Sequence, residues 1–200
     1  MRAPVHDLHV SNLVSYVSLG SGMAAMTLAL GGFIPHAGIA IAVSAIADTF
    51  DGRFARRFRR TPRQARLGHE LDSLVDAIAF GAAPAVVVGA AADARPIAVS
   101  IAATLYATAV VTRLAHYNLQ EGERRFIGIP TPAAALMGAT SLLVPVSGWP
   151  ALWPLIAGAG LMISPISLAR PGRRGLAAFA VWAVVVVVAL GTAALRRSTP

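Results

Sequence analysis

Apolar runs long enough to cross a membrane recur along the chain, separated by short polar breaks that contain glycine or proline. Seven such runs occur, at residues 11–33, 37–57, 69–92, 96–118, 131–147, 150–169 and 175–195. A run of about eighteen or more apolar residues is typical of a transmembrane helix. The pattern therefore predicts an all-α, polytopic membrane bundle that forms one integral membrane domain over residues 1–200. We expect residues 1–10 to form a short interfacial segment before the first span.

Small residues recur inside these runs. Examples are the pair Gly20 and Gly22 in the first run and the pair Gly158 and Gly160 in the sixth. In lipid, small side chains let helix backbones approach closely. We therefore expect these positions to lie at contacts between helices.

The 17 basic residues are all arginine, and most of them lie in the loops 53–66, 119–130 and 170–174. These are alternate loops, so they share one side of the membrane, which the positive-inside rule makes cytoplasmic. Topology explains the net charge of +8 better than nucleic-acid binding does, so we expect no nucleic-acid partner. Arg196 and Arg197 would lie outside. Either the last run does not cross fully or the other loops outweigh this pair.

Four aspartates lie within the apolar runs, at Asp48, Asp51, Asp72 and Asp76. Ionisable residues in membrane segments are costly and indicate a functional site. On helices, Asp48 and Asp51 share one face, and Asp72 and Asp76 share another. If the two faces meet, four carboxylates gather, and they could persist only around bound cations. With no cysteine in the chain and no ligating histidine nearby, Mg²⁺ or Mn²⁺ is the expected metal. A pair of such ions would neutralise the four carboxylates.

The aspartates belong to the pattern Asp-x2-Asp-Gly-x2-Ala-Arg, followed by Gly-x3-Asp-x3-Asp. It resembles the signature of the CDP-alcohol phosphotransferases, with every signature position filled: Asp48, Asp51, Gly52, Ala55, Arg56, Gly68, Asp72 and Asp76. The resemblance implies a six-helix core over about residues 10–170, to which the run at 175–195 adds a C-terminal span. It also implies a multi-pass protein of a bacterial cell membrane, a homodimer, and an active site that faces the cytoplasm.

The resemblance assigns roles within the signature. Asp48, Asp51 and Asp72 are the principal metal ligands, and Asp76 combines metal binding with the role of catalytic general base. Gly52, Ala55 and Gly68 keep the helix surfaces low, so that a nucleotide can lie against them, and the Arg56 guanidinium suits phosphate oxygens. These four residues form the expected nucleotide- and phosphate-binding set.

Three further segments resemble the serine-using branch of this family. They are Gly68 to Pro84, Thr112 to Asn118, and Phe126 to Ala135, although His116 stands where that branch usually has arginine. This resemblance implies transfer of a phosphatidyl group from CDP-diacylglycerol to L-serine, giving phosphatidylserine and CMP. Arg113 and Asn118 are the candidate acceptor-binding residues, with a salt bridge or snorkelling for Arg113 and helix capping for Asn118 as alternatives. We expect Gly128 to shape the start of the fifth span.

Other functions remain open at this point. Another member of the family could use glycerol 3-phosphate or inositol phosphate as the acceptor, or an archaeal-type lipid as the donor. A cation transporter would use the aspartates as an ion path, which requires polar residues that continue across the spans. A structural protein without activity would be expected to lack part of the signature, and no signature residue is missing.

Overall fold

A computed structural model of the chain describes residues 8–55, 58–119, 125–169 and 172–198. Each of the seven apolar runs contains a helix, and the elements are η2 (Val10–Asn12), α1 (Leu13–Leu30), α2 (Ile34–Ala55), α3 (Pro62–Asp76), η3 (Ala77–Ala82), α4 (Ala83–Ala91), α5 (Pro96–Leu119), α6 (Thr131–Ser141), η4 (Trp149–Leu152), α7 (Trp153–Ile163) and α8 (Arg173–Ser198). Two short strands, β1 (Arg125–Ile127) and β2 (Ser167–Ala169), form an antiparallel pair.

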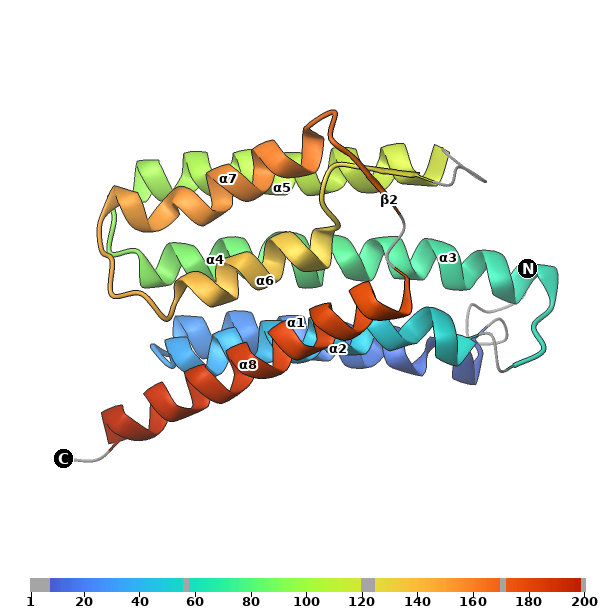
Figure 1. Ribbon diagram of the computed structural model, residues 1–200, viewed down its shortest axis with the longest axis horizontal. Coiled ribbons are helices and arrows are strands. Elements are labelled where there is room, and N and C mark those ends of the chain that lie inside the picture. The colour runs from blue at the N-terminus through green and yellow to red at the C-terminus, as the bar shows by residue number, and fades with distance from the viewer. Residues whose placement is uncertain (1–7, 56–57, 120–124, 170–171, 199–200) are drawn as a thin grey trace.

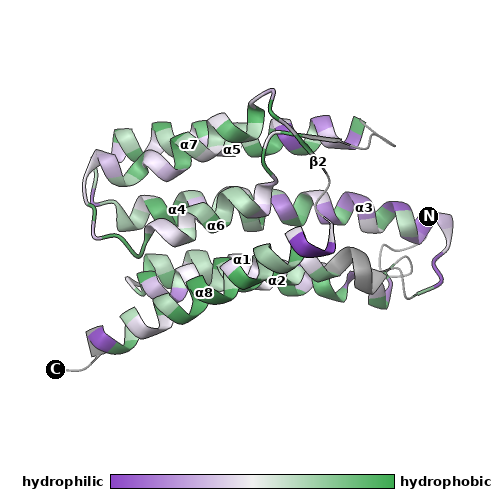
Figure 2. Ribbon diagram, in the orientation of Figure 1, coloured by the Kyte–Doolittle hydropathy of each residue, from purple (hydrophilic) through white to green (hydrophobic). Residues whose placement is uncertain are grey.

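Long helices dominate this arrangement (Figure 1). Among the described residues, four helical stretches are long and apolar enough to cross a membrane: Val10–Leu30, Pro62–Ala91, Pro96–Leu119 and Arg173–Arg196. Hydrophobic residues predominate along the middle of the bundle, and hydrophilic residues gather on α3 and near the start of α8 (Figure 2). The predicted all-α membrane bundle is confirmed, including a C-terminal helix beyond the core.

The predicted extents of the fifth and sixth spans were wrong. Helices α6 and α7 contain 11 residues each, so each rises only about 17 Å. Helix α7 ends at Ile163, and the next residue, Ser164, is extended with ψ 150°, because the proline that follows Ser164 disfavours the helical conformation. The chain then enters β2, so the end of the predicted run at 150–169 is a strand rather than a membrane helix.

The third helical stretch begins at Pro62, earlier than the predicted residue 69. A capping box fixes this start: the Gln64 backbone N–H donates to Thr61 Oγ1 at 3.3 Å, and the Thr61 N–H donates to Gln64 Oε1 at 3.0 Å. Because α3 begins at Pro62, its first turns are polar and precede the apolar part of the helix. Gly68, Asp72 and Asp76 therefore lie on one continuous helix, α3.

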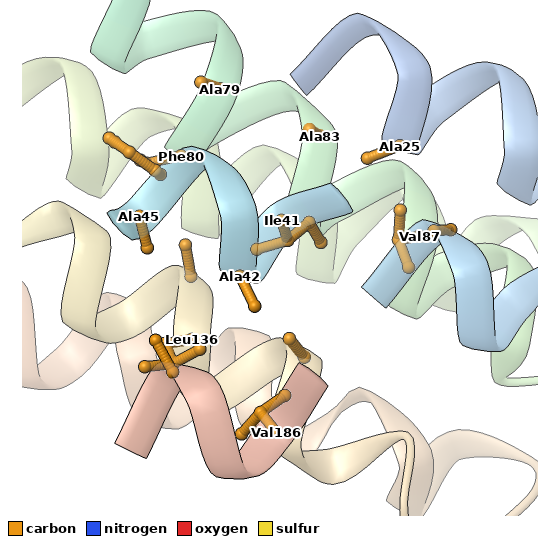
Figure 3. Packing of buried hydrophobic residues seen from close by; sticks show 14 of the residues in the cluster. Ala25, Ile41, Ala42, Ala45, Ala79, Phe80, Ala83, Val87, Leu136 and Val186 are labelled. Carbon is orange, nitrogen blue, oxygen red and sulfur yellow. The ribbon is translucent and has the colours of Figure 1, made fainter. Parts of the chain in front are cut away.

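Small residues bring the central helices together, as predicted. Helix α2 packs against α1, α6 and α8, and alanines fill much of the core between these helices (Figure 3). A Cβ added at Gly22 would lie 2.8 Å from the Ala79 Cα, and one at Gly158 would lie 3.1 Å from the Tyr106 ring. Gly20 and Gly160 have nothing within 4 Å of such a Cβ, so the prediction failed at those two positions.

A π-helical segment, η3, follows directly after Asp76. Pro84 has no N–H to donate to the Phe80 carbonyl four residues earlier. The buried Tyr106 hydroxyl on α5 donates to that carbonyl instead, at 3.0 Å. At Gly81, an added Cβ would lie 3.2 Å from Val110 Cγ1, so the glycine lets α5 approach. The segment that resembles the serine-using branch therefore locks α5 against the helix that carries Asp76.

The β1–β2 pair joins the segment before α6 to the segment after α7. Gly128 follows β1 with φ 70°, a left-handed conformation that favours glycine. Its N–H donates to the Ile166 carbonyl at 2.9 Å, and the Ile129 N–H donates to the Leu161 carbonyl at 3.2 Å. The chain at Gly128 lies directly against α7, which supports the expected role of Gly128 in shaping the start of α6.

We predict that Gly128→Ala destabilises the protein. The left-handed backbone alone is unfavourable for alanine by about 1–3 kcal/mol, and the new Cβ would lie 2.7 Å from the Met162 carbonyl carbon. Thermal unfolding of the purified protein in detergent measures the effect. Gly160→Ala is the matched control, because nothing lies within 4 Å of its added Cβ. An unchanged midpoint for Gly128→Ala would contradict this account of the strand pair.

Candidate active site

Three aspartates converge where α2 passes α3. Carboxylate oxygens of Asp48, Asp72 and Asp76 all lie within 4.8 Å of one another, and the three side chains are half-buried. Asp48 comes from α2, and Asp72 and Asp76 lie one turn apart on α3. The predicted meeting of the two aspartate-bearing faces is confirmed for these three residues.

Three further signature residues lie at the end of α2. Asp51, Gly52 and Ala55 belong to this helix, but their side chains fall outside the described part of the structure. Their spacing of three, four and seven residues from Asp48 places them on its face of the helix. Arg56 lies outside the described residues. Their predicted roles in binding metal and nucleotide therefore stay predictions.

The residues that lie next to the aspartates on the inner side of the bundle are apolar and buried. Ala45, Ala79 and Phe80 are each 0% exposed. The polar contact deeper between α1 and α2 is a hydrogen bond between Ser18 Oγ and Ser44 Oγ, at 2.7 Å. An ion path would require polar groups that continue across the spans, and the described core does not provide them. This packing argues against the transporter alternative.

Gly68 faces a buried amide that the sequence did not single out. A Cβ added at Gly68 would lie 3.3 Å from Asn12 Oδ1 and 3.4 Å from Arg60 Nη1. Asn12 is 2% exposed, and its Oδ1 accepts a hydrogen bond from Ser11 Oγ at 3.3 Å. Its Nδ2 has no hydrogen-bond partner among the described residues. A buried donor left unpaired is unfavourable, so this amide is suited to a ligand that lies against Gly68.

Arg113 lies beside the carboxylates. Its guanidinium interacts electrostatically with Asp76 and with Tyr117. Its Nε is buried and has no hydrogen-bond partner among the described residues. The location is compatible with both predicted roles, charge pairing and acceptor contact.

Asn118 makes its hydrogen bonds across to α3 rather than capping α5. Its Nδ2 donates to Ser73 Oγ at 3.0 Å, and Ser73 Oγ lies 3.3 Å from Asn118 Oδ1. Ser73 stands between Asp72 and Asp76 in the chain. The pair, here called the Ser73–Asn118 clasp, ties the end of α5 to α3, the helix that carries Asp72 and Asp76. The sequence marked both segments by their resemblance to one branch but did not predict this contact.

The donor set fits a hard divalent cation. Among the described residues, the cluster consists of carboxylates alone, without histidine or cysteine. Oxygen-only ligand sets favour Mg²⁺, Mn²⁺ or Ca²⁺ over softer metals. These aspartates are therefore the residues that could hold the expected ions.

Comparison with known proteins agrees with this site. Residues 8–164 match the model of the CDP-alcohol phosphatidyltransferase family. The chain belongs to this family. Members of the family are generally dependent on divalent metals, and the match contains α1 to α7 but not α8.

Several relatives carry names that include serine. A CDP-diacylglycerol–serine O-phosphatidyltransferase of Mycobacterium leprae is 36% identical over 153 residues, which cover 70% of this chain and 50% of the relative. An archaetidylserine synthase of Methanothermobacter thermautotrophicus is 32% identical over 167 residues, covering 82% of this chain and 71% of the relative. A CDP-diacylglycerol–serine O-phosphatidyltransferase of Helicobacter pylori is 34% identical over 149 residues, covering 70% and 60%. The chain thus spans about half the length of the mycobacterial relative.

We predict that Asp72→Asn weakens divalent-cation binding by at least tenfold, because it removes a negative ligand from the centre of the cluster. Titration of the purified protein with Mn²⁺, followed by electron paramagnetic resonance of the free ion, measures this without any turnover. Asp93→Asn is the matched control, since Asp93 lies outside the cluster and asparagine tolerates its positive φ of 46°. Equal Mn²⁺ affinity in the two variants would refute the metal site.

Proposed function

We propose that this protein transfers a phosphatidyl group from CDP-diacylglycerol to the hydroxyl of L-serine, giving phosphatidylserine and CMP. The observation that carries the proposal is the convergence of Asp48, Asp72 and Asp76 beside the Ser73–Asn118 clasp. The cluster would bind the divalent cations that phosphoryl transfer requires. The clasp joins two segments that resemble the serine-using branch. The names of the mycobacterial, helicobacterial and archaeal relatives support serine as the acceptor.

In the proposed reaction, the serine oxygen forms a bond to the lipid-bearing phosphorus, and the bond from that phosphorus to the CMP oxygen breaks. Asp76 accepts the serine hydroxyl proton. General-base catalysis requires a carboxylate within hydrogen-bonding reach of the attacking hydroxyl. We favour direct displacement over a covalent intermediate, because the chain has no cysteine and no activated nucleophile is evident beside the aspartates.

The aspartates would position the donor. Asp48, Asp51, Asp72 and Asp76 would hold a pair of Mg²⁺ or Mn²⁺ ions. When bound, such ions neutralise the carboxylates and stabilise charge on the donor pyrophosphate. Gly52, Ala55 and Gly68 would leave room for the nucleotide, Arg56 would contact its phosphates, and the free Asn12 amide would donate to it.

Arg113 and Asn118 would serve the acceptor side. Arg113 adds positive charge near Asp76, which suits the carboxylate of serine. The Asn118 amide is engaged by Ser73, so we assign it mainly to positioning of the end of α5. Fixing this end next to α3 would hold Arg113 and Asp76 at a constant separation.

We further propose that the site faces the cytoplasm of a bacterial cell membrane and that the protein is a homodimer. Arg59, Arg60, Arg63 and Arg66 surround the start of α3, and the strand pair brings the second and third arginine-bearing loops together. An excess of arginine on one side supports a cytoplasmic location for that side. Cross-linking in native membranes would test the dimer.

Release of CMP tests the proposed function. The purified protein receives CDP-diacylglycerol and Mg²⁺ or Mn²⁺, with L-serine, glycerol 3-phosphate or inositol phosphate in parallel reactions. We expect cation-dependent release with L-serine alone, together with phosphatidylserine as the lipid product. Release with a phosphorylated acceptor would keep the family and overturn the serine assignment. Absence of release with every acceptor would overturn the proposed activity.

We predict that Asp76→Asn lowers kcat by about 10²- to 10⁴-fold, the usual contribution of a positioned general base. Binding of CDP-diacylglycerol should persist, because Asp48 and Asp72 remain. Single-turnover CMP release and equilibrium binding of the nucleotide separate the two effects. Asp93→Asn again serves as the control. Near-normal turnover by Asp76→Asn would exclude Asp76 as the base.

The Ser73–Asn118 clasp predicts energetic coupling. Ser73→Ala and Asn118→Ala should each lower kcat/KM for serine by about fivefold, which corresponds to the loss of one hydrogen bond worth about 1 kcal/mol. The double variant should be little worse than either single variant, because both remove the same interaction. If the two effects simply add, the clasp has no role in placing the acceptor.

A further inference from the structure

Helix α8 lies outside the residues that match the family and has no role in the proposed reaction. It is nevertheless well packed on the core. Ala183 is 0% exposed and Val186 and Leu190 are each 1% exposed, and Trp182 Nε1 donates to Thr140 Oγ1 on α6 at 3.1 Å. Figure 1 shows α8 crossing the bundle beside α2, the helix that carries Asp48. An appended helix in this position could influence the placement of α2 and so of Asp48.

The contact between α2 and α8 opens into a crevice at the start of α8. Its volume is about 410 Å³, and it is lined by Thr49, Phe50, Arg173, Leu176, Ala177 and Ala180. Phe50 follows Asp48 by two residues, which is about 200° around the helix. The crevice therefore lies on roughly the opposite side of α2 from the carboxylates and is a separate site.

Positive charge gathers at one end of the crevice. Arg173 is exposed, is the first residue of α8, and makes no hydrogen bond or ion pair with another described residue. Arg174 follows it, and the first turn of α8 contains no acidic residue. The N-terminal N–H groups of a helix add further positive potential. This end of the crevice suits a phosphate group.

The rest of the lining is apolar. Leu176, Ala177 and Ala180 continue along α8, and Phe50, which is 47% exposed, faces them from α2. The crevice also lies at the start of the membrane-length stretch Arg173–Arg196. A cationic end at the membrane boundary, followed by an apolar wall, matches a molecule with an anionic head and hydrocarbon chains.

We propose that this crevice binds an anionic phospholipid, with the phosphate at Arg173 and an acyl chain against Phe50 and Leu176. Thr49 and Phe50 lie directly after Asp48 in α2. A lipid held there would steady the end of α2 from the side opposite the metal site. The protein would then respond to the anionic lipid content of its membrane. This proposal does not depend on the identity of the acceptor.

The test titrates the full-length protein, purified in detergent, with dioleoyl phosphatidylglycerol or dioleoyl phosphatidylcholine, and reads the first bound lipid by native mass spectrometry. The two probes have the same chains and differ in head-group charge. We expect preferential binding of phosphatidylglycerol and about fivefold weaker binding in Arg173→Gln, since one arginine near a lipid surface contributes about 1 kcal/mol. Arg95→Gln is the matched control, because Arg95 directly precedes α5 and does not line the crevice.

A second pair of variants tests the apolar wall and keeps the test decisive if Arg173→Gln does not fold. Ala177→Leu fills the crevice and should weaken binding of both probes, whereas Ala178→Leu, outside the lining, should not. An equal loss of phosphatidylglycerol affinity in Arg173→Gln and Arg95→Gln would overturn the proposal. Equal binding of the two lipids, or complete displacement of phosphatidylglycerol by inorganic phosphate, would overturn it as well.

Discussion

Like charges repel one another, and the repulsion grows as the surroundings become less polar. Asp48, Asp72 and Asp76 bring carboxylate oxygens within 4.8 Å of one another while half-buried. Without compensating positive charge, this arrangement would push α2 away from α3 or force the carboxylates to take up protons. Arg113 supplies part of the compensation, and the proposed divalent cations would add to it. Cation binding and the packing of α2 against α3 would then stabilise each other.

The surrounding fold holds the two aspartate-bearing helices in place. Gly22 lets α1 lie directly against Ala79, one turn beyond Asp76. The π-helical segment and Pro84 leave the Phe80 carbonyl available to Tyr106, which fixes α5. π-helical turns of this kind are frequent at functional sites, because they shift the register of the residues beside them. The Ser73–Asn118 clasp fixes the other end of α5 to the same helix.

The sequence predicted those parts of the structure that follow from local periodicity. Helical spacing was sufficient to place Asp48 and Asp51 on one face and Asp72 and Asp76 on another, and apolar run length was sufficient for the bundle. The meeting of the two faces is a result of the packing of α2 beside α3. Local periodicity could not predict contacts between distant segments. Asn12 meets Gly68, and Ser73 meets Asn118, only through tertiary packing. The length of α7 was misjudged because Pro165, which follows the end of this helix, lies inside an apolar run. Helix α6 ends at Ser141, four residues before Pro145, and the apolar pattern does not mark that end.

We propose that the aspartate cluster, loaded with divalent cations, drives transfer of the phosphatidyl group to the serine hydroxyl. Serine labelled with ¹⁸O in its hydroxyl group tests this claim directly, because ³¹P nuclear magnetic resonance detects the isotope bonded to phosphorus. The account predicts an ¹⁸O-shifted signal in the lipid product, and only when Mg²⁺ or Mn²⁺ is present. A lipid product without the label at phosphorus, or a labelled product formed equally well without a divalent cation, would contradict it.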